Sequence, residues 1–311
     1  MALESRVFKT RLWLTCSAPA RWNNAVTMNL ASLFGGLADH TLELPTGDRV
    51  SVSSHGGQVL HWRVDDGEEL LYLSPAASAS DGQAIRGGIP VCWPQFNMRG
   101  PSPKHGFARH ATWRLHGRDD TSLLLELTPA DLTEAVRAAW PHEFQLRQKI
   151  DLAPGQLTVT LDVSNLGQAP FSFTTALHSY LRVADVAQAQ LSGLERTLMS
   201  DGQAATRSPF QPPRFGAAVD RVHHVPPPAA DDTFHELQWT LTTPARTLTL
   251  RQSDTLPDVV VWNPGPDAGI ADLAEDEWRQ FVCVEAAAVD VPVTLAPGAE
   301  WIGWQAITLQ R

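Results

Sequence analysis

The sequence is poor in cysteine, and the cysteines that it has do not resemble a disulfide framework. Cys16, Cys92 and Cys283 are odd in number and far apart, which is typical of reduced thiols in a cytoplasmic protein. No Cys-x-x-Cys pair occurs, so a zinc ribbon and a redox pair are excluded. No cluster in the sequence has the ligand spacing of a catalytic zinc site, and we therefore expect no metal.

The signature motifs of several common enzyme classes are also missing. The sequence has no phosphate-binding loop of the Walker A type, no G-x-G-x-x-G, no G-x-S-x-G and no H-E-x-x-H. Nucleotide binding, serine hydrolysis and zinc proteolysis therefore lose their simplest support. No apolar run approaches the ~20 residues that a membrane-spanning helix needs.

Positive charge is scarce over the chain as a whole. The 24 lysines and arginines stand against 34 aspartates and glutamates, which gives a net charge of −10. Such a charge argues against nucleic acid or an anionic membrane as the main partner. Hydrophobic residues make up 43% and charged residues 19% of the 311 residues, so the chain can build a sizeable core.

The pattern of apolar residues predicts many short strands. Apolar and polar residues alternate over 123–127, 144–150, 157–163 and 247–251, which indicates strands with one buried face. Further strands are expected at 49–54, 57–64, 69–73, 111–116, 171–183, 235–241, 258–262, 281–286 and 300–309. Two stretches alone, 130–139 and 271–279, have a helical pattern. We therefore predict an all-β fold, a large antiparallel β-sandwich, rather than a Rossmann fold or a TIM barrel.

The amino-terminal residues are excluded from this fold. A basic stretch before Leu12–Cys16 imitates a signal peptide, but its apolar part is shorter than such a peptide requires. We expect residues 1–28 to be a disordered extension, or a start placed too early, and residues 29–311 to form a single domain. The proline-rich stretch 225–230 is interpreted as a loop within that domain.

One segment stands out by its charge. Residues 82–118 contain no Asp or Glu and six cations, which are Arg86, Arg99, Lys104, Arg109, Arg114 and Arg118. Glycine- and proline-rich turns in the same segment would hold these cations in a rigid loop, as in sites that bind phosphate or carboxylate. A solvated basic face is the alternative, but the neighbouring aromatic residues make it the less favoured one.

Two polar residues lie in strands that are otherwise apolar. Glu285 interrupts the run Phe281–Ala286, and His178 follows Leu177 in the predicted strand 171–183. A buried carboxylate costs several kcal/mol unless it is paired or functional, and its raised pKa suits a general base. A structural role is the commoner one for a histidine among apolar neighbours. Spacing alone does not bring the two residues together.

An ordered set of motifs resembles one enzyme family. The motifs are Ile85–Phe96, His105–Arg109, Leu177–Leu181, Asp220–Val222, Trp262–Pro264 and Phe281–Ala286. Together they resemble the hexose-6-phosphate mutarotases, the glucose-6-phosphate 1-epimerase branch of the aldose 1-epimerase family, over roughly residues 35–309. The resemblance implies a galactose-mutarotase-like β-supersandwich, a hexose 6-phosphate as small-molecule substrate, and neither a metal nor an organic cofactor.

The resemblance also implies roles for individual residues. His178 resembles the general acid that protonates the ring oxygen, and Glu285 the general base that takes the proton of the anomeric hydroxyl. The implied substrate-binding residues are Arg86, Gln95, Lys104, His105, Arg109 and Asp220. Among these, the two arginines resemble phosphate and sugar ligands.

Two positions depart from the family pattern. Lys104 stands where Gln is usual before His-Gly, and His223 stands where Tyr is usual. Two alternative functions stay open, an epimerase of unphosphorylated sugars and a carbohydrate-binding module without catalysis. We expect a cytoplasmic monomer that binds neither nucleic acid nor membranes.

Overall fold

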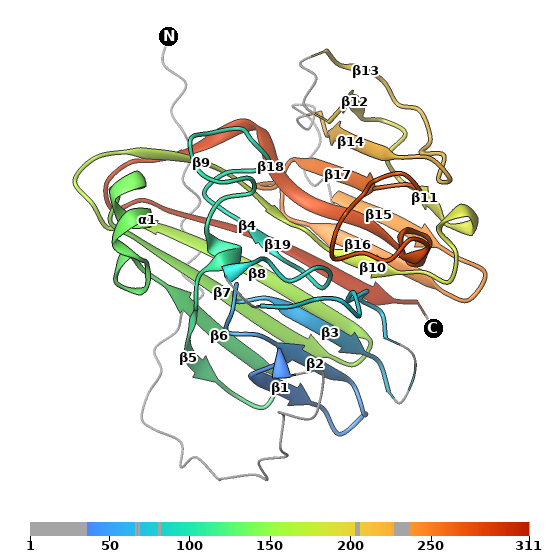
Figure 1. The fold of residues 1–311 in the computed structure, drawn as a ribbon, viewed down its shortest axis with the longest axis horizontal. Helices are drawn as coiled ribbons and strands as arrows, with labels where there is room; N and C mark the ends of the chain where they lie inside the picture. The colour runs from blue at the N-terminus through green and yellow to red at the C-terminus, as the bar shows by residue number, and fades with distance from the viewer. Residues whose placement is uncertain are drawn as a thin grey trace, which may run out of the picture.

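The computed structural model describes residues 36–65, 67, 69–79, 82–202, 206–226 and 237–310. The predicted extension 1–28 and the end of the proline-rich stretch 225–230 lie outside these residues. The described part of the chain is almost entirely β-structure (Figure 1), which confirms the predicted fold class. No helix of this described part is long and apolar enough to cross a membrane.

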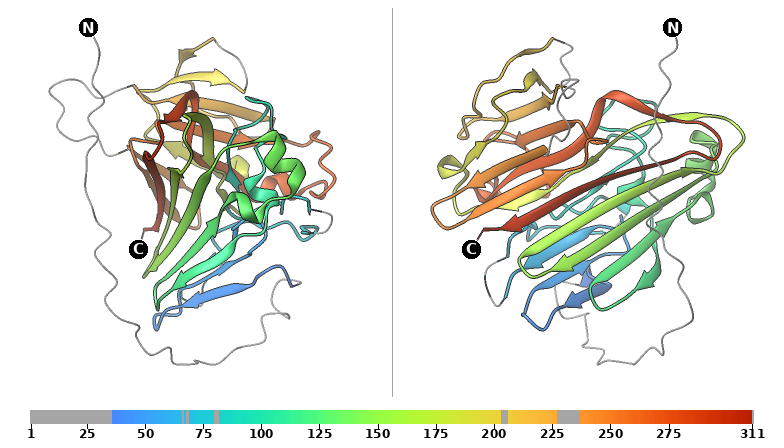
Figure 2. Two further views of the ribbon diagram at one scale, coloured as in Figure 1. Left: turned by 90° about the vertical axis from the view of Figure 1, so that its left-hand side faces the viewer. Right: turned by 180° about the vertical axis from the view of Figure 1, so that it is seen from behind.

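Two antiparallel sheets of eight strands dominate the fold (Figure 2). One, which we call the β8 sheet, has the order β11 (Gln190–Ser192), β15 (Leu237–Thr242), β16 (Thr247–Gln252), β19 (Glu300–Leu309), β8 (Gln156–Asn165), β7 (Phe144–Ala153), β6 (Ser122–Leu127) and β5 (Arg114–Arg118). The other, the β18 sheet, has the order β13 (Ser208–Pro209), β12 (Leu198–Asp201), β14 (Val219–His224), β17 (Asp258–Asn263), β18 (Phe281–Leu295), β9 (Phe171–Leu177) and β4 (Val91–Cys92), with β10 (Tyr180–Arg182) also paired to β18. A smaller third sheet consists of β1 (His40–Glu43), β2 (Arg49–Val52) and β3 (Val59–Arg63).

The strands with strict alternation form as expected. In β7 and β8, buried residues alternate with half-buried polar ones along most of each strand. Ile150 of β7 lies opposite Val159 of β8, and both side chains belong to the main hydrophobic core. One face of the β8 sheet is therefore buried against this core, which removes its apolar surface from water.

Strand β18 differs because both of its faces are buried. Val282 and Val284 point into the main core, where they meet Val259 and Val261 of β17. Cys283 and Glu285 point to the opposite face, since successive side chains of a strand alternate. This opposite face of the β18 sheet carries the candidate site.

Some predicted elements are shorter or different in the structure. The prediction of a helix at 130–139 is confirmed in part, as the short α1 (Glu134–Ala139) capped by the Thr133 side chain after a 3-10 turn (Pro129–Asp131). The predicted helix at 271–279 is wrong, since the structure has a single 3-10 turn, Glu277–Gln280. Backbone groups of the stretch 271–279 bond to side chains instead of forming helical bonds. The Ser74 hydroxyl donates to the Asp272 carbonyl, and the Glu277 carboxylate accepts from the Ala274 amide.

Several short elements in all three sheets were not predicted. The predicted strand 69–73 forms isolated bridges rather than a strand. Strands β1, β4, β11, β12, β13 and β14 were not predicted, and most of them have four residues or fewer. Short strands give too few alternating positions for a period of two to be visible. Two further 3-10 turns, Ala108–His110 and Val186–Gln188, complete the elements.

Candidate active site

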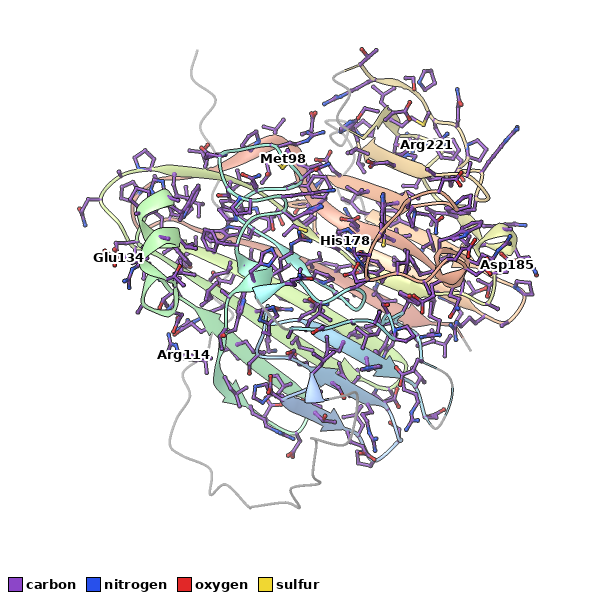
Figure 3. All side chains as sticks on the ribbon, in the orientation of Figure 1. Met98, Arg114, Glu134, His178, Asp185 and Arg221 are labelled. Atoms are coloured by element: carbon purple, nitrogen blue, oxygen red, sulfur yellow. The ribbon has the colours of Figure 1, made fainter. Side chains whose placement is uncertain are left out.

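His178 and Glu285 come together on the β18 sheet. His178 lies where the chain passes from β9 to β10, and both of these strands pair with β18. Its Nε2 atom is 3.4 Å from Oε1 of Glu285. The two residues are 7% and 1% exposed, and Figure 3 shows His178 near the middle of the molecule. The structure thus joins two residues that the sequence could only name separately.

Each residue of this pair also has one polar side-chain atom that forms no hydrogen bond within the described part of the chain. Nδ1 of His178 and Oε2 of Glu285 are buried and have no hydrogen-bond partner among the described residues. An unpaired buried polar atom costs about 1–3 kcal/mol, and more when it is charged. Such unpaired atoms are retained where they serve a ligand or a reaction.

The surroundings shift the pKa values of the pair in opposite directions. Burial, followed by the charges of Arg109 and Arg86, lowers the pKa of His178 to about 3. Burial and the charge of Asp220 raise the pKa of Glu285 well above its usual range, although Arg109 acts against this. Both shifts favour the uncharged forms of the pair, a neutral imidazole and a protonated carboxyl group.

Aromatic rings enclose the histidine. The ring of Tyr180 stacks on His178 with a centroid distance of 4.8 Å, and the edges of His105 and Trp262 complete the enclosure at 5.6 and 5.9 Å. Nδ1 of His105 accepts from the Asn97 amide and lies 3.3 Å from the Cys92 sulfur. Burial lowers the pKa of His105, so it is neutral.

Three of the six cations in segment 82–118 are near the pair. The charges of Arg86, Lys104 and Arg109 each lower the pKa values of both His105 and His178. Arg86 donates through Nε to Asp272, at 3.0 Å, and through Nη1 to the Tyr180 hydroxyl, at 3.1 Å. Arg109 donates to the Lys104 carbonyl, and its Nε is buried without a partner among the described residues.

The other three cations are used elsewhere. Arg99 donates to the carbonyls of Gly202 and Val289, and Arg118 donates to the Thr41 carbonyl. Arg114 pairs with Glu126 on β6 and with Asp131 in the 3-10 turn that follows β6. The segment that lacks acidic residues is therefore not one basic surface, because acids from other parts of the chain neutralise one end of it.

Asp220 and Gln95 occupy different kinds of position. Asp220 lies on β14 with an exposed side chain, and its charge reaches Glu285. Partial burial raises its pKa, against the opposing charges of Lys104 and Arg99. Gln95 is 3% exposed, donates to the Asn97 carbonyl and accepts from the Ser102 amide. Its amide group therefore shapes the loop that carries Lys104 and His105.

His223 departs from the family pattern but does not line the site. It points to the face of β14 opposite Asp220, where it lies 3.0 Å from the Thr197 hydroxyl and contacts the Phe210 ring. The neighbouring His224 points to the site face and connects Ser200 with Asp258 at 3.0 Å on each side. The second Asp258 oxygen accepts the amides of Val289 and Asp290. This buried network holds the irregular part of β18 in place.

Sequence reasoning missed several residues of the site. The sequence did not indicate that Asp272 and Gln305 belong to the site, because their hydrogen bonds are to residues far away in the chain. Gln305 of β19 donates to the Val284 carbonyl, and its Oε1 accepts from the Ser179 hydroxyl. It thereby holds the backbone beside both His178 and Glu285. Cys283 could have been found, since it is two residues from Glu285 and shares its face.

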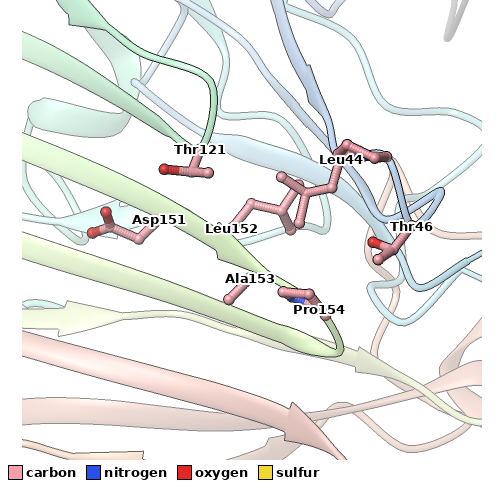
Figure 4. A pocket seen from close by; sticks show the side chains of 8 residues that line it. Leu44, Thr46, Thr121, Asp151, Leu152, Ala153 and Pro154 are labelled. Carbon is pink, nitrogen blue, oxygen red and sulfur yellow. The ribbon is translucent and has the colours of Figure 1, made fainter.

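A hollow elsewhere in the molecule carries none of these groups. It has a volume of about 510 Å³ and is lined by Leu44, Pro45, Thr46, Thr121, Asp151, Leu152, Ala153 and Pro154 (Figure 4). Its lining is mostly apolar, and its acidic residue, Asp151, pairs with Lys149 at 2.6 Å. No predicted site residue lines it, so the buried pair locates the chemistry better than the hollow does.

Comparisons with known proteins show the family to which the chain belongs. The family model for aldose 1-epimerase matches residues 39–308. A protein of Cenchrus ciliaris named "Putative glucose-6-phosphate 1-epimerase" is 37% identical over 266 residues, which cover 80% of this chain and 78% of that protein. A Salmonella typhimurium protein of the same name is 33% identical over 252 residues, covering 78% and 81% of the two chains.

A solved structure supports the same assignment. The crystal structure of a protein from Salmonella typhimurium, titled as "a putative mutarotase", superimposes with a TM-score of 0.73 at 29% identity, and covers 86% of this chain and 89% of that one. Fold and site together define an isomerase with a galactose-mutarotase-like β-sandwich. The chain belongs to the aldose 1-epimerase family.

Proposed function

We propose that the protein interconverts the α and β anomers of a hexose 6-phosphate, with glucose 6-phosphate as the expected substrate. The observation that carries this proposal is the buried contact between His178 and Glu285, because mutarotation needs one proton donor and one proton acceptor. The names of the curated relatives point to the same reaction.

In the proposed mechanism the sugar ring opens and closes between the two side chains. Glu285 takes the proton of the anomeric hydroxyl while His178 gives a proton to the ring oxygen, and the C1–O5 bond breaks. Rotation about C1–C2 turns the aldehyde, and closure on its other face uses the same two groups with their roles reversed. Each proton transfer is worth about 10²–10⁴-fold in rate.

The phosphate group would supply the protonation state that this mechanism needs. The charges of Arg109, Arg86 and Lys104 help to hold the pKa of His178 low. A phosphate dianion among these cations would compensate their charge, which favours movement of the shared proton from Glu285 to His178. Binding energy from the phosphate would thus be used at the anomeric carbon.

Arg109 offers a position for the phosphate, because its Nε is buried and lacks a partner in the described part of the chain. We propose Arg86, Lys104, His105, Arg109 and Asp220 as the substrate-binding residues, and Gln95 as the residue that shapes their loop. Arg86 would exchange or share its bond to Asp272 when phosphate binds.

Exchange NMR of the two anomers tests the proposal. We expect strong acceleration with glucose 6-phosphate and much less with glucose. Removal of a charge-assisted bond of ~1.5–3 kcal/mol by Arg109→Ala should lower kcat/KM for the phosphosugar tenfold or more. Arg114→Ala is the matched control, because Arg114 belongs to the same basic segment but pairs with Glu126 and Asp131.

The two alternative functions give different results in this experiment. Equal acceleration of both sugars would contradict the phosphate assignment and favour an epimerase of free sugars. Binding of the phosphosugar without acceleration would favour a binding module. We further propose a cytoplasmic monomer, supported for the location by two buried free thiols, Cys92 and Cys283.

A further inference from the structure

A cysteine sulfur lies beside the acid–base pair. The ligand atoms of His178, Cys283 and Glu285 all lie within 4.8 Å of one another, and the three residues are buried. Among the described residues this is the one group of three or more histidine, cysteine or acidic side chains gathered this closely. The sequence showed no metal-ligand spacing, because His178 lies in the connection between β9 and β10, about a hundred residues before β18.

The backbone explains why the three side chains converge. Cys283 and Glu285 lie two residues apart on β18 and therefore share a face. Cys283 is directly opposite Tyr180 of β10, and Leu177 of β9 is opposite Ala286. His178 lies between these two paired positions. Cys283 and Glu285 are thus fixed by strand pairing, and His178 by the two-residue connection between two paired strands.

We propose that this group binds a thiophilic divalent cation such as Zn²⁺, and that the bound cation inhibits the enzyme. Imidazole nitrogen, thiolate sulfur and carboxylate oxygen are the ligands that zinc prefers, and three protein ligands leave one position open. The inhibition part of this inference rests on the proposed mutarotase function, whereas the binding part does not.

The separation within the His178–Glu285 pair and the charges around it fit such an ion, and the Cys283 sulfur lies within 4.8 Å of both. Two ligands about 2.0–2.1 Å from a tetrahedral zinc lie about 3.3 Å apart, and Nε2 of His178 is 3.4 Å from Oε1 of Glu285. Binding releases the Cys283 thiol proton and the proton of the pair. The resulting thiolate and carboxylate balance the two charges of the ion, which offsets the repulsion from Arg86, Lys104 and Arg109.

Inhibition follows from the atoms that the ion would occupy. The lone pairs of Glu285 and His178 that exchange protons with the sugar would be coordinated instead. The sugar could then be neither protonated nor deprotonated by the pair. Cys283 has no part in the proposed proton transfers, so its removal separates metal binding from catalysis.

Spectroscopy with Co²⁺ and kinetics with Zn²⁺ test the proposal. All variants carry Cys16→Ala, so that the remaining thiols are Cys92 and Cys283. We expect Co²⁺ to give thiolate-to-metal absorption in the near ultraviolet, and Zn²⁺ in a metal-ion buffer to inhibit anomer exchange. Cys283→Ala should keep the exchange rate without metal, lose the absorption band and need at least ~10-fold more Zn²⁺ for inhibition.

Cys92→Ala is the matched control, because it removes the other buried thiol of the site. It should retain both the band and the inhibition. Absence of the band in the parent protein, equal inhibition of Cys283→Ala, or activation by Zn²⁺ would each overturn the proposal. A protein with the band but without mutarotase activity would keep the binding site and contradict the proposed function instead.

Discussion

At the scale of single residues, the candidate site contains a buried carboxyl group, Glu285, whose ionised form is destabilised by the fold. Glu285 is 1% exposed, and one of its oxygens has no partner among the described residues. Its raised pKa means that the folded state binds this proton more tightly than the unfolded chain does. As the pH rises above the value of the unfolded carboxyl, about 4.5, the folded state therefore loses stability.

Glu285→Gln should consequently lose activity and gain stability. The amide keeps the shape of the side chain but cannot accept a proton, so kcat should fall by about 10²-fold or more. Tm should exceed that of the wild type, and the difference should widen from about pH 4.5 upward. Calorimetry across pH 5–8 measures this. A folded variant with near-normal turnover would remove Glu285 from the mechanism.

The pH dependence of kcat/KM should be bell-shaped, because the reaction needs one proton on the pair. The acid limb reports a second proton entering at His178, whose pKa is lowered to about 3. The basic limb reports loss of the last proton from Glu285, whose pKa is raised. Both limbs belong to the coupled pair. In Glu285→Gln the basic limb should disappear, and its persistence would contradict the assignment.

At the scale of elements, the residues that we propose as catalytic are positioned by a strand of the opposite sheet. Gln305 of β19 bonds to Ser179 and to the Val284 carbonyl, each of which adjoins a member of the pair. Ser179 and Val284 are also joined directly through their backbones. The separation of 3.4 Å within the pair therefore depends on contacts made by the β8 sheet.

Gln305→Leu should lower kcat more than it changes KM, because the variant loosens the pair and leaves the cations in place. It should also cost about 1–3 kcal/mol of stability, since two buried partners lose their bonds. Gln148→Leu is the control: Gln148 is buried in the same sheet, and its amide has no hydrogen-bond partner among the described residues. Equal effects on kcat in both variants would contradict the positioning role.

The elements also show what a sequence can predict. Strict alternation in β7 and β8 identified these strands, and an acid in the apolar strand β18 identified Glu285. The two-residue spacing of Cys283 and Glu285 would also have placed both side chains on one face of the strand. The basic segment misled in part, because Arg114 and Arg118 follow Arg109 in sequence but lie on β5, whereas Arg109 lies in a 3-10 turn. Asp272 was beyond prediction, since its partner Arg86 is fixed by tertiary contacts alone.

At the scale of the whole molecule, the two large sheets share one hydrophobic core. Its members include Leu157 and Leu250 from the β8 sheet and Val261 and Val284 from the β18 sheet. Because each sheet covers one side of this core, neither can unfold without exposing it. The proposed single domain, residues 29–311, should therefore unfold in a single transition. The calorimetric and van't Hoff enthalpies should agree. Two resolved transitions would contradict the single domain.

The ion pair between Arg86 and Asp272 connects the candidate site to a loop outside the sheets. Asp272 lies outside every strand of the described structure, whereas Glu285 belongs to β18 and His178 lies between two strands that pair with it. In the proposed mechanism the β18 sheet therefore supplies the proton transfers, while the loop that carries Asp272 would set the charge that Arg86 offers to the substrate. Substitutions in that loop leave the strand pairing intact. Substrate preference can therefore diverge between descendants of one ancestor while the reaction itself is inherited unchanged.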